Sequence, residues 1–157
     1  FIHATWDEID FKNRQWVIPK GRMKGRKEHV IYLSDQAMDI LTGMKVCAMG
    51  SDYLMPGRYD IKKPLSNAAL NNVIDGTVKR INEKGIEFEP VTVHDLRRTA
   101  STLLHEAGYN SDWIEKCLAH VQNGVRAVYN KAEYAEQRRK MLQEWADMVD
   151  EWIKEKD

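Results

Sequence analysis

The sequence has little cysteine and no long apolar run. Its 157 residues include two cysteines, Cys47 and Cys117, which show neither metal-ligand spacing nor a disulfide framework. We therefore predict that both are small buried side chains in a reducing cytoplasm. No segment approaches the roughly 18 apolar residues of a membrane helix, and the first residues lack the pattern of a secretion signal. No membrane partner is expected.

The sequence also lacks net charge, because 24 lysines and arginines balance 24 acidic residues. The distribution is uneven, however, and distribution matters more than the sum for binding a polyanion. One basic segment contains Lys12, Arg14, Lys20, Arg22, Lys24, Arg26 and Lys27. This segment suits a surface that faces phosphates. A solvated basic hairpin without a ligand explains the charge equally well.

Apolar periodicity predicts one mostly helical α+β unit. Strands are expected near residues 6–11, at 15–18 and at 29–33, with a basic hairpin between the last two. Helices are expected at 35–44 after Ser34, from Ser66 to about 83, at 94–107, after Ser111, and at 135–154. We predict a small three-stranded antiparallel sheet with a basic hairpin, packed on a helical bundle.

Side-chain patterns indicate which faces of these helices are buried. The second helix is predicted to bury a stripe that includes Val73 and Val78, and Leu96 is predicted to point into the core from the third. The stripe of the last helix is Met141, Leu142, Trp145, Met148, Val149, Trp152 and Ile153. This last stripe is expected to pack on its own domain. Docking on a neighbouring subunit is the alternative.

Two short segments contain residues suited to phosphate chemistry. His94 and Arg97 are three apart, so they share a face near the start of a helix, where backbone N–H groups also attract anions. The Arg97 fork fits two phosphate oxygens, and His94 can donate to the same group. Further on, His120 ends a Leu-Ala-His string and Tyr129 follows nine residues later. Each residue alone is better explained structurally, but together they form a possible nucleophile with a phosphate clamp.

The order and spacing of these residues resemble the tyrosine recombinase family. The segments HDLRRTASTLLHEAG, LAHVQNGVRAVYNKAEY, RRKMLQEWADMVD and RMKGRKEHVIYLS are similar to the integrases of satellite phages and pathogenicity islands. The resemblance covers nearly the whole chain. It implies the recombinase catalytic fold and an enzyme that integrates or excises a mobile element.

The resemblance also implies a role for each motif residue. Tyr129 would attack the scissile phosphate, form a 3′-phosphotyrosyl link and release a 5′-hydroxyl. Arg97 would stabilise charge on the non-bridging oxygens, and His94 and His120 would hydrogen-bond the phosphate or assist proton transfer. Lys24, in the hairpin, would protonate the departing oxygen.

Two of these roles have competitors in the sequence, and the hairpin offers further contacts. Lys20 and Lys27 compete with Lys24 as general acid, and Tyr134 competes with Tyr129 as nucleophile. The expected DNA-binding residues are Lys20, Arg22, Arg26, Lys27 and Arg98. Neither a metal nor another cofactor is expected.

The family's first arginine, expected upstream of the sheet, has no counterpart in this sequence. The resemblance therefore implies that residues 1–157 are a carboxyl-terminal catalytic domain without the first-arginine segment and the amino-terminal DNA-binding domain. We expect the isolated chain to be inactive or severely impaired. The implied partners are double-stranded attachment sites, other recombinase subunits in a tetramer, and DNA-bending accessory proteins, in the nucleoid of a bacterial cytoplasm.

Three other functions compete with this interpretation. A DNA-binding module without chemistry would also use the basic hairpin. A type IB topoisomerase uses a similar Arg, His, Lys and Tyr set, although the short interval from His120 to Tyr129 disfavours it. A metal-dependent nuclease is disfavoured because no histidine–carboxylate cluster has ligand spacing.

Overall fold

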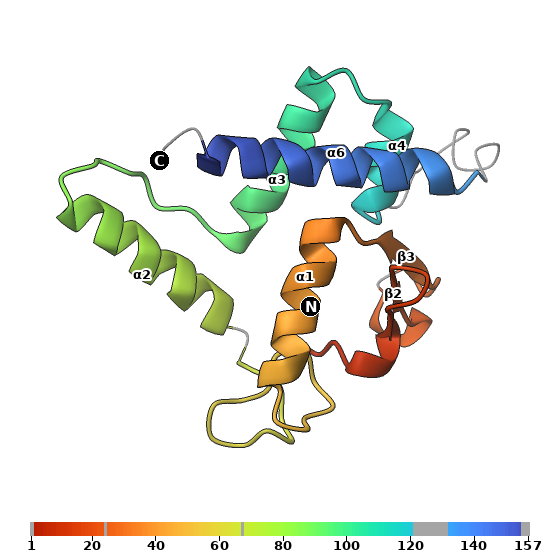
Figure 1. The fold of residues 1–157 in the computed structure, drawn as a ribbon. Coiled ribbons are helices and arrows are strands. Elements are labelled where there is room, and N and C mark those ends of the chain that lie inside the picture. Colours follow the sequence, from red (N-terminus) through yellow and green to blue (C-terminus); the bar gives the residue numbers. More distant parts are fainter. Residues whose placement is uncertain (1, 24, 67, 121–131, 155–157) are drawn as a thin grey trace.

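The computed structural model describes residues 2–23, 25–66, 68–120 and 132–154. The proposed general acid Lys24 and the proposed nucleophile Tyr129 lie outside the described residues. In chain order, a small sheet is followed by α1, α2, α3, α4 and the long α6 (Figure 1). Among the described helices, none is both long and apolar enough to cross a membrane.

The predicted three-stranded antiparallel sheet is confirmed. Its strands are β1 (Ile9–Asp10), β2 (Gln15–Ile18) and β3 (His29–Tyr32), in the order β1-β2-β3. Trp16 pairs with Ile9 on one side and with Ile31 on the other. The basic hairpin joins β2 to β3 and contains a short 3-10 turn, η2 (Lys20–Arg22). A second 3-10 turn, η1 (Trp6–Glu8), precedes β1, where the sequence had suggested strand.

The predicted helices are present, with shifted ends. They are α1 (Asp35–Cys47), α2 (Ala69–Glu83), α3 (Val93–Glu106), α4 (Ser111–Cys117) and α6 (Ala135–Lys154). Ser34 caps α1 as predicted, since its hydroxyl accepts from the Ala37 N–H at 3.2 Å. The predicted caps of the second and fourth helices are wrong. α2 begins three residues after Ser66 without a side-chain cap, and Asn110 caps α4 through the Asp112 N–H.

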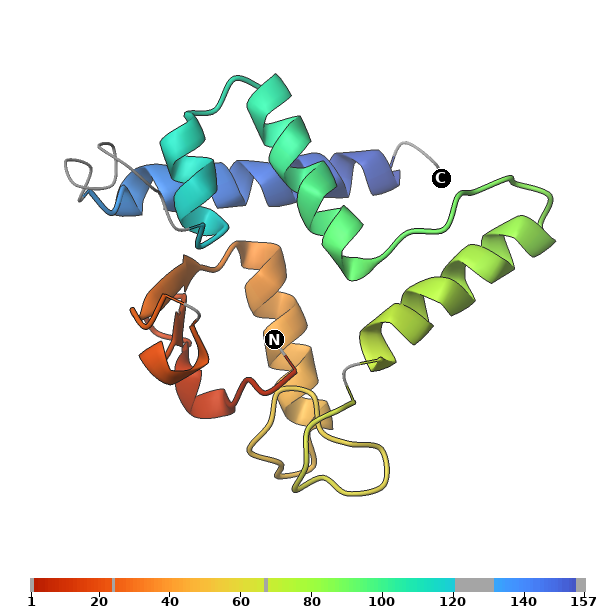
Figure 2. The same ribbon diagram turned by 180° about the vertical axis from the view of Figure 1, so that it is seen from behind.

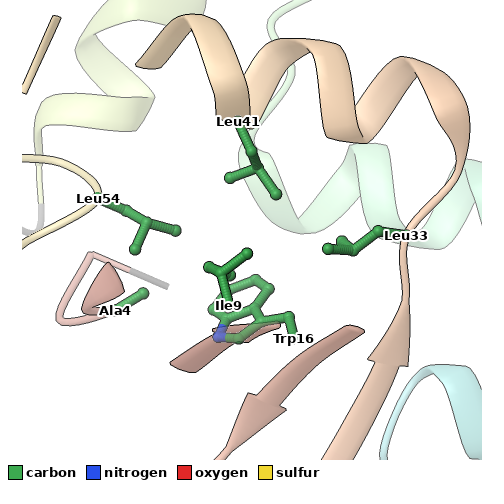
Figure 3. Packing of buried hydrophobic residues seen from close by; sticks show 6 residues of the cluster. All are labelled: Ala4, Ile9, Trp16, Leu33, Leu41 and Leu54. Carbon is green, nitrogen blue, oxygen red and sulfur yellow. The ribbon is translucent and has the colours of Figure 1, made fainter. Parts of the chain in front are cut away.

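Two hydrophobic clusters hold the fold together. The first lies between the sheet and α1 and includes Trp16 and Leu41, with Leu54 closing it from the following loop (Figure 3). The second joins α3, α4 and α6 through Leu104, Ile114 and Met141. Burial of such side chains contributes about 1.5–3 kcal/mol each, so each cluster fixes its own set of elements.

Helix α6 connects these two clusters. It crosses α3 and α4 on one side and reaches α1 and β3 on the other (Figures 1 and 2). The Gln143 side chain accepts from the Asp35 N–H at 2.9 Å, and the Gln36 amide donates to Asp147 at 2.8 Å. Helix α6 therefore holds α1, and the sheet packed on α1, by polar bonds on one side, and it holds α3 and α4 by apolar packing on the other.

The predicted self-packing of α6 is confirmed for most of its length. Met141 is fully buried, and Trp145 and Met148 pack against the second cluster. The final turn differs, because Trp152 and Ile153 are 42% and 61% exposed. Trp152 is held edge-on against Trp145, with ring centroids 5.7 Å apart.

Three burial predictions are wrong. Leu96 is 55% exposed because α3 crosses α6, so that Leu104 in its second half is covered and its first turns are not (Figure 1). Val73 is 64% exposed, since α2 stands away from the body and buries only Val78 of its stripe. Cys47 is exposed at the last turn of α1, whereas Cys117 is partly buried as expected.

Candidate active site

The start of α3 is fixed by a capping box. The Thr92 hydroxyl accepts from the Asp95 N–H at 3.3 Å, and the Asp95 carboxylate accepts from the Thr92 N–H at 3.0 Å. The hydroxyl of Thr92 also donates to this carboxylate, and these bonds lower the pKa of Asp95. His94 and Arg97 lie within the first two turns that this box organises, and both are exposed.

We expect Thr92→Ala to destabilise the protein by about 1 kcal/mol, the usual cost of losing such a cap. Chemical denaturation measures this loss, and Thr99→Ala, an exposed position further along α3, is the matched control. Equal stability of both variants would show that the box does not hold the helix end.

Arg97 joins α3 to the end of α4. One guanidinium nitrogen donates to the carbonyl oxygen of Leu118, which precedes Ala119 and His120. A guanidinium carries five N–H donors, so this bond leaves most of the fork for another acceptor. The two motifs are therefore in direct contact, although 21 residues separate Arg97 from Leu118.

The Leu-Ala-His string ends α4 in a Schellman motif. The Ala119 N–H donates to the Lys116 carbonyl at 3.2 Å, and the His120 N–H donates to the Glu115 carbonyl at 3.1 Å. Ala119 has a φ of +52°, a left-handed conformation that usually favours glycine. This turn brings the Leu118 carbonyl to Arg97 and carries His120 out of the helix.

Both predicted histidines are solvent-exposed in the described structure. His120 hydrogen-bonds the Glu115 carboxylate through Nδ1 at 2.7 Å, which leaves Nε2 available for a second partner. His94 occupies the first turn of α3, on the same helix as Arg97. The structure thus brings Arg97 to the Leu-Ala-His turn. The relation of these groups to Tyr129 lies outside the described residues.

The basic hairpin is only partly available to an external anion. Lys20, Arg26 and Lys27 are exposed. Arg22 instead forms an ion pair with Glu8, whose side chain is 8% exposed, so its charge is largely used within the protein. On α3, Arg98 pairs with Asp95 at 3.0 Å but remains 74% exposed.

His29, which the sequence did not single out, lies where β3 meets α4. Burial is the main reason that its pKa is lowered, and the Arg138 and Arg97 cations add to this effect. A hydrogen bond with the Cys117 backbone and the Glu133 carboxylate oppose it. His29 therefore remains neutral in a positively charged environment.

We expect stability to fall in mild acid because of His29. Its folded pKa lies below the ordinary 6.5, so below pH 6.5 the unfolded chain binds more protons and unfolding becomes easier as pH falls. The free energy of unfolding should fall by at most about 1.4 kcal/mol per pH unit, and by less than this because His29 is partly solvated. Denaturation curves between pH 7 and 5 test this. His29→Gln should flatten the dependence, and an unchanged slope would exclude His29 as its source.

Two further features of this region have recognisable signals in the sequence. Thr92-x-x-Asp95 is a capping-box pattern. Arg138 lies three residues before Met141 and seven before Trp145, so helical spacing places it on the buried stripe of α6. No local pattern marks His29. The described part of the chain contains no cluster of three or more His, Cys, Asp or Glu side chains that could hold a metal ion.

Comparison with known proteins confirms the predicted family. Residues 1–136 match the model of the phage integrase family. Prophage integrase IntA of Escherichia coli K12 is 42% identical over 93% of this chain, and the integrase of Shigella phage Sf6 is 39% identical over 95%. The chain spans only 34% and 37% of the lengths of these two relatives.

Solved structures support the same fold. The crystal structure of XerA recombinase superposes with a TM-score of 0.63 at 17% identity, over 87% of this chain and 51% of that one. The Tn1549 transposon integrase, solved in complex with a circular intermediate DNA, gives a TM-score of 0.59 at 17% identity, over 89% and 52%. The family match over residues 1–136 and the similarity to prophage integrases, together with the shared fold, lead to one conclusion: this chain belongs to the phage integrase family of tyrosine recombinases.

Proposed function

We propose that the protein containing this chain performs site-specific DNA recombination, integrating or excising a mobile element. The observation that carries the proposal is the bond from Arg97 to the Leu118 carbonyl, which joins the His-x-x-Arg helix to the Leu-Ala-His turn. Exposed cationic donors at this junction suit a phosphate of double-stranded DNA.

In the proposed reaction, the Tyr129 oxygen attacks the scissile phosphorus. A Tyr–O–P bond forms while the bond from phosphorus to the 5′ oxygen breaks. Lys24 donates a proton to that leaving oxygen, and Arg97 stabilises charge on the non-bridging oxygens. His94 and His120 are assigned to hydrogen bonding with the same phosphate or to proton transfer from the tyrosine.

Rejoining reverses these steps with a different strand. The 5′-hydroxyl of a partner strand attacks the phosphotyrosine, the P–O bond to Tyr129 breaks, and the phenol regains its proton. One phosphodiester is exchanged for another, so no nucleotide hydrolysis is required. The proposed stabilising charges come from side chains, and EDTA should leave the reaction unaffected.

We further propose the domain organisation and assembly that this reaction needs. Residues 1–157 serve as the carboxyl-terminal catalytic domain, and the first arginine and the DNA-clamping domain are assigned to other parts of the protein. Four subunits assemble on two attachment sites, and DNA-bending proteins assist. The basic residues assigned to DNA contact are Lys20, Arg26, Lys27 and Arg98, whereas Arg22, which the sequence grouped with them, is largely occupied by its ion pair with Glu8.

A recombination assay with the whole protein tests this function. Two plasmids carry the attachment sequences that border the mobile element, and junction formation is measured with and without EDTA. Junctions of defined sequence in both conditions support a metal-independent recombinase. Binding without junctions or nicks would instead support a DNA-binding module, and relaxation of plasmids that lack attachment sites would support a topoisomerase.

A further inference from the structure

Arg138, near the start of α6, is a charged residue in the protein interior. Its exposed fraction is 1%, the same as that of Ile114 in the second core cluster. One guanidinium nitrogen donates to the Val30 carbonyl of β3 at 2.5 Å, and another donates to the Glu133 carbonyl at 3.3 Å. The guanidinium also lies over the Tyr32 ring, 5.1 Å from its centroid.

The charge of Arg138 is incompletely compensated. The carboxylate of Glu133 lies 3.8 Å away, and its side chain is 69% exposed. The Nε atom is buried and has no hydrogen-bond partner among the described residues. Taking a cation out of water carries a desolvation cost that a single partner at 3.8 Å offsets poorly, so a buried ion pair of this kind is a weak source of stability. Packing alone therefore does not explain an arginine here.

The contacts of Arg138 meet at the junction of three elements. It bonds the backbone of β3, the strand that follows the basic hairpin, and of Glu133, just before α6. Helix α6 also packs on α4, where the partly buried Cys117 precedes the Leu118 carbonyl that Arg97 holds. The Arg138 cation opposes the rise in the pKa of the Cys117 thiol that burial causes. The cations of Arg138 and Arg97 both lower the pKa of His29, the first residue of β3, so this histidine lies within the electrostatic reach of both guanidinium groups.

We propose that Arg138 is a positioning residue that fixes β3, and with it the basic hairpin, against the corner where Arg97 meets α4. This inference rests on the proposed function, in which a hairpin lysine protonates the leaving 5′ oxygen. Loss of Arg138 removes the hydrogen bond to the Val30 carbonyl, so β3 is no longer held in a fixed position relative to α4. The step that suffers is proton delivery, because the donor and the departing oxygen must lie within hydrogen-bond distance.

A substrate with a sulfur leaving group isolates this step. In a 5′-bridging phosphorothiolate, attack by the tyrosine breaks a P–S bond and releases a thiolate, which needs no proton because a thiol is far more acidic than an alcohol. Single-turnover cleavage by the whole protein is measured at saturating DNA on the oxygen and sulfur substrates. We expect Arg138→Met to cleave the oxygen substrate about 10- to 100-fold more slowly than the parent protein. On the sulfur substrate its rate should return to near that of the parent.

Arg139 provides the matched control. It is the next residue of α6 and lies over the same Tyr32 ring at 4.7 Å, but its guanidinium donates to the Asn13 carbonyl rather than to β3. Arg139→Met should change cleavage of either substrate by no more than about twofold, the usual range for a surface substitution. Arg138→Lys, which keeps the charge and can reach one carbonyl, should recover part of the lost rate.

The outcomes separate the inference from the function on which it rests. An equal defect of Arg138→Met on both substrates, or no defect on either, overturns the positioning role. If Arg138→Met does not fold, Arg138→Lys carries the same two-substrate comparison. Failure of the parent protein to cleave either substrate contradicts the proposed function itself.

Discussion

Tyr129→Phe should abolish strand cleavage by the whole protein while leaving DNA binding intact. The change removes one oxygen, the atom that would form the bond to phosphorus, and keeps the ring. Loss of a nucleophile in a covalent mechanism typically reduces the rate by more than about 10⁴-fold. The measurement is single-turnover cleavage of an attachment-site duplex with a nick near the scissile phosphate, so that a short fragment diffuses away and the adduct accumulates.

Tyr134→Phe is the matched control for this experiment. Tyr134 is the competing tyrosine and lies immediately before α6, where its carbonyl accepts from the Arg138 N–H at 2.8 Å. The spacing of nine residues from His120 assigns the nucleophile to Tyr129, so cleavage by Tyr134→Phe should stay close to that of the parent. Loss of cleavage in Tyr134→Phe with cleavage retained in Tyr129→Phe would reverse the assignment.

Arg97→Ala should produce the second large effect. It removes the donor fork from the proposed phosphate site and also breaks the bond to the Leu118 carbonyl. Removal of one preorganised donor to a developing negative charge lowers the reaction rate by about 10²- to 10³-fold. Arg97 is proposed to make at least one such hydrogen bond to the non-bridging phosphate oxygens. Cleavage at saturating DNA reports this loss separately from binding.

Arg97→Lys separates charge from geometry at the same position. Lysine keeps the positive charge but lacks the planar fork that fits two oxygens and reaches a third acceptor. We expect Arg97→Lys to bind DNA with the parent's salt dependence and still cleave slowly. Arg98→Ala, next in the sequence and paired with Asp95 instead, should weaken binding modestly and reduce the salt slope by about one. Parent-like cleavage by Arg97→Ala would remove Arg97 from the mechanism.

Local patterns in the sequence predicted most of the secondary structure. Apolar and polar residues alternate around Trp16 in β2, and apolar residues recur at helical spacing in α6. In both segments the secondary structure follows this periodicity. The motif residues are predicted from their order and spacing. The structure adds that Arg97 and Leu118 are in contact.

Predictions that depended on the crossing of helices were less successful. Leu96 has the spacing of a buried residue, but burial depends on where α3 meets α6, which no local pattern specifies. The exposure of Val73 has the same origin, because α2 is amphipathic yet lies apart from the body. Arg138 is the reverse case, since its charge suggested an exposed position although its helical spacing matched the buried stripe.

Helix ends show a third kind of difference. Ser66 and Ser111 are good capping residues in isolation, but α2 begins after Ala68 without a side-chain cap, and Ser111 competes with the neighbouring Asn110. At α4, Asn110 is the N-cap because its side chain accepts a hydrogen bond from the Asp112 N–H at 2.8 Å. At α3, the reciprocal bonds of Thr92 and Asp95 fix the start one residue before His94.

The most direct test of the central claim is identification of the protein–DNA bond. The whole protein is incubated with the nicked attachment-site duplex in EDTA, digested, and the DNA-linked peptide is sequenced by mass spectrometry. The proposed mechanism predicts a single adduct in which Tyr129 carries the 3′ phosphate of the cleaved strand. An adduct on another residue, or cleaved DNA with a free 3′ phosphate and no protein attached, would contradict it.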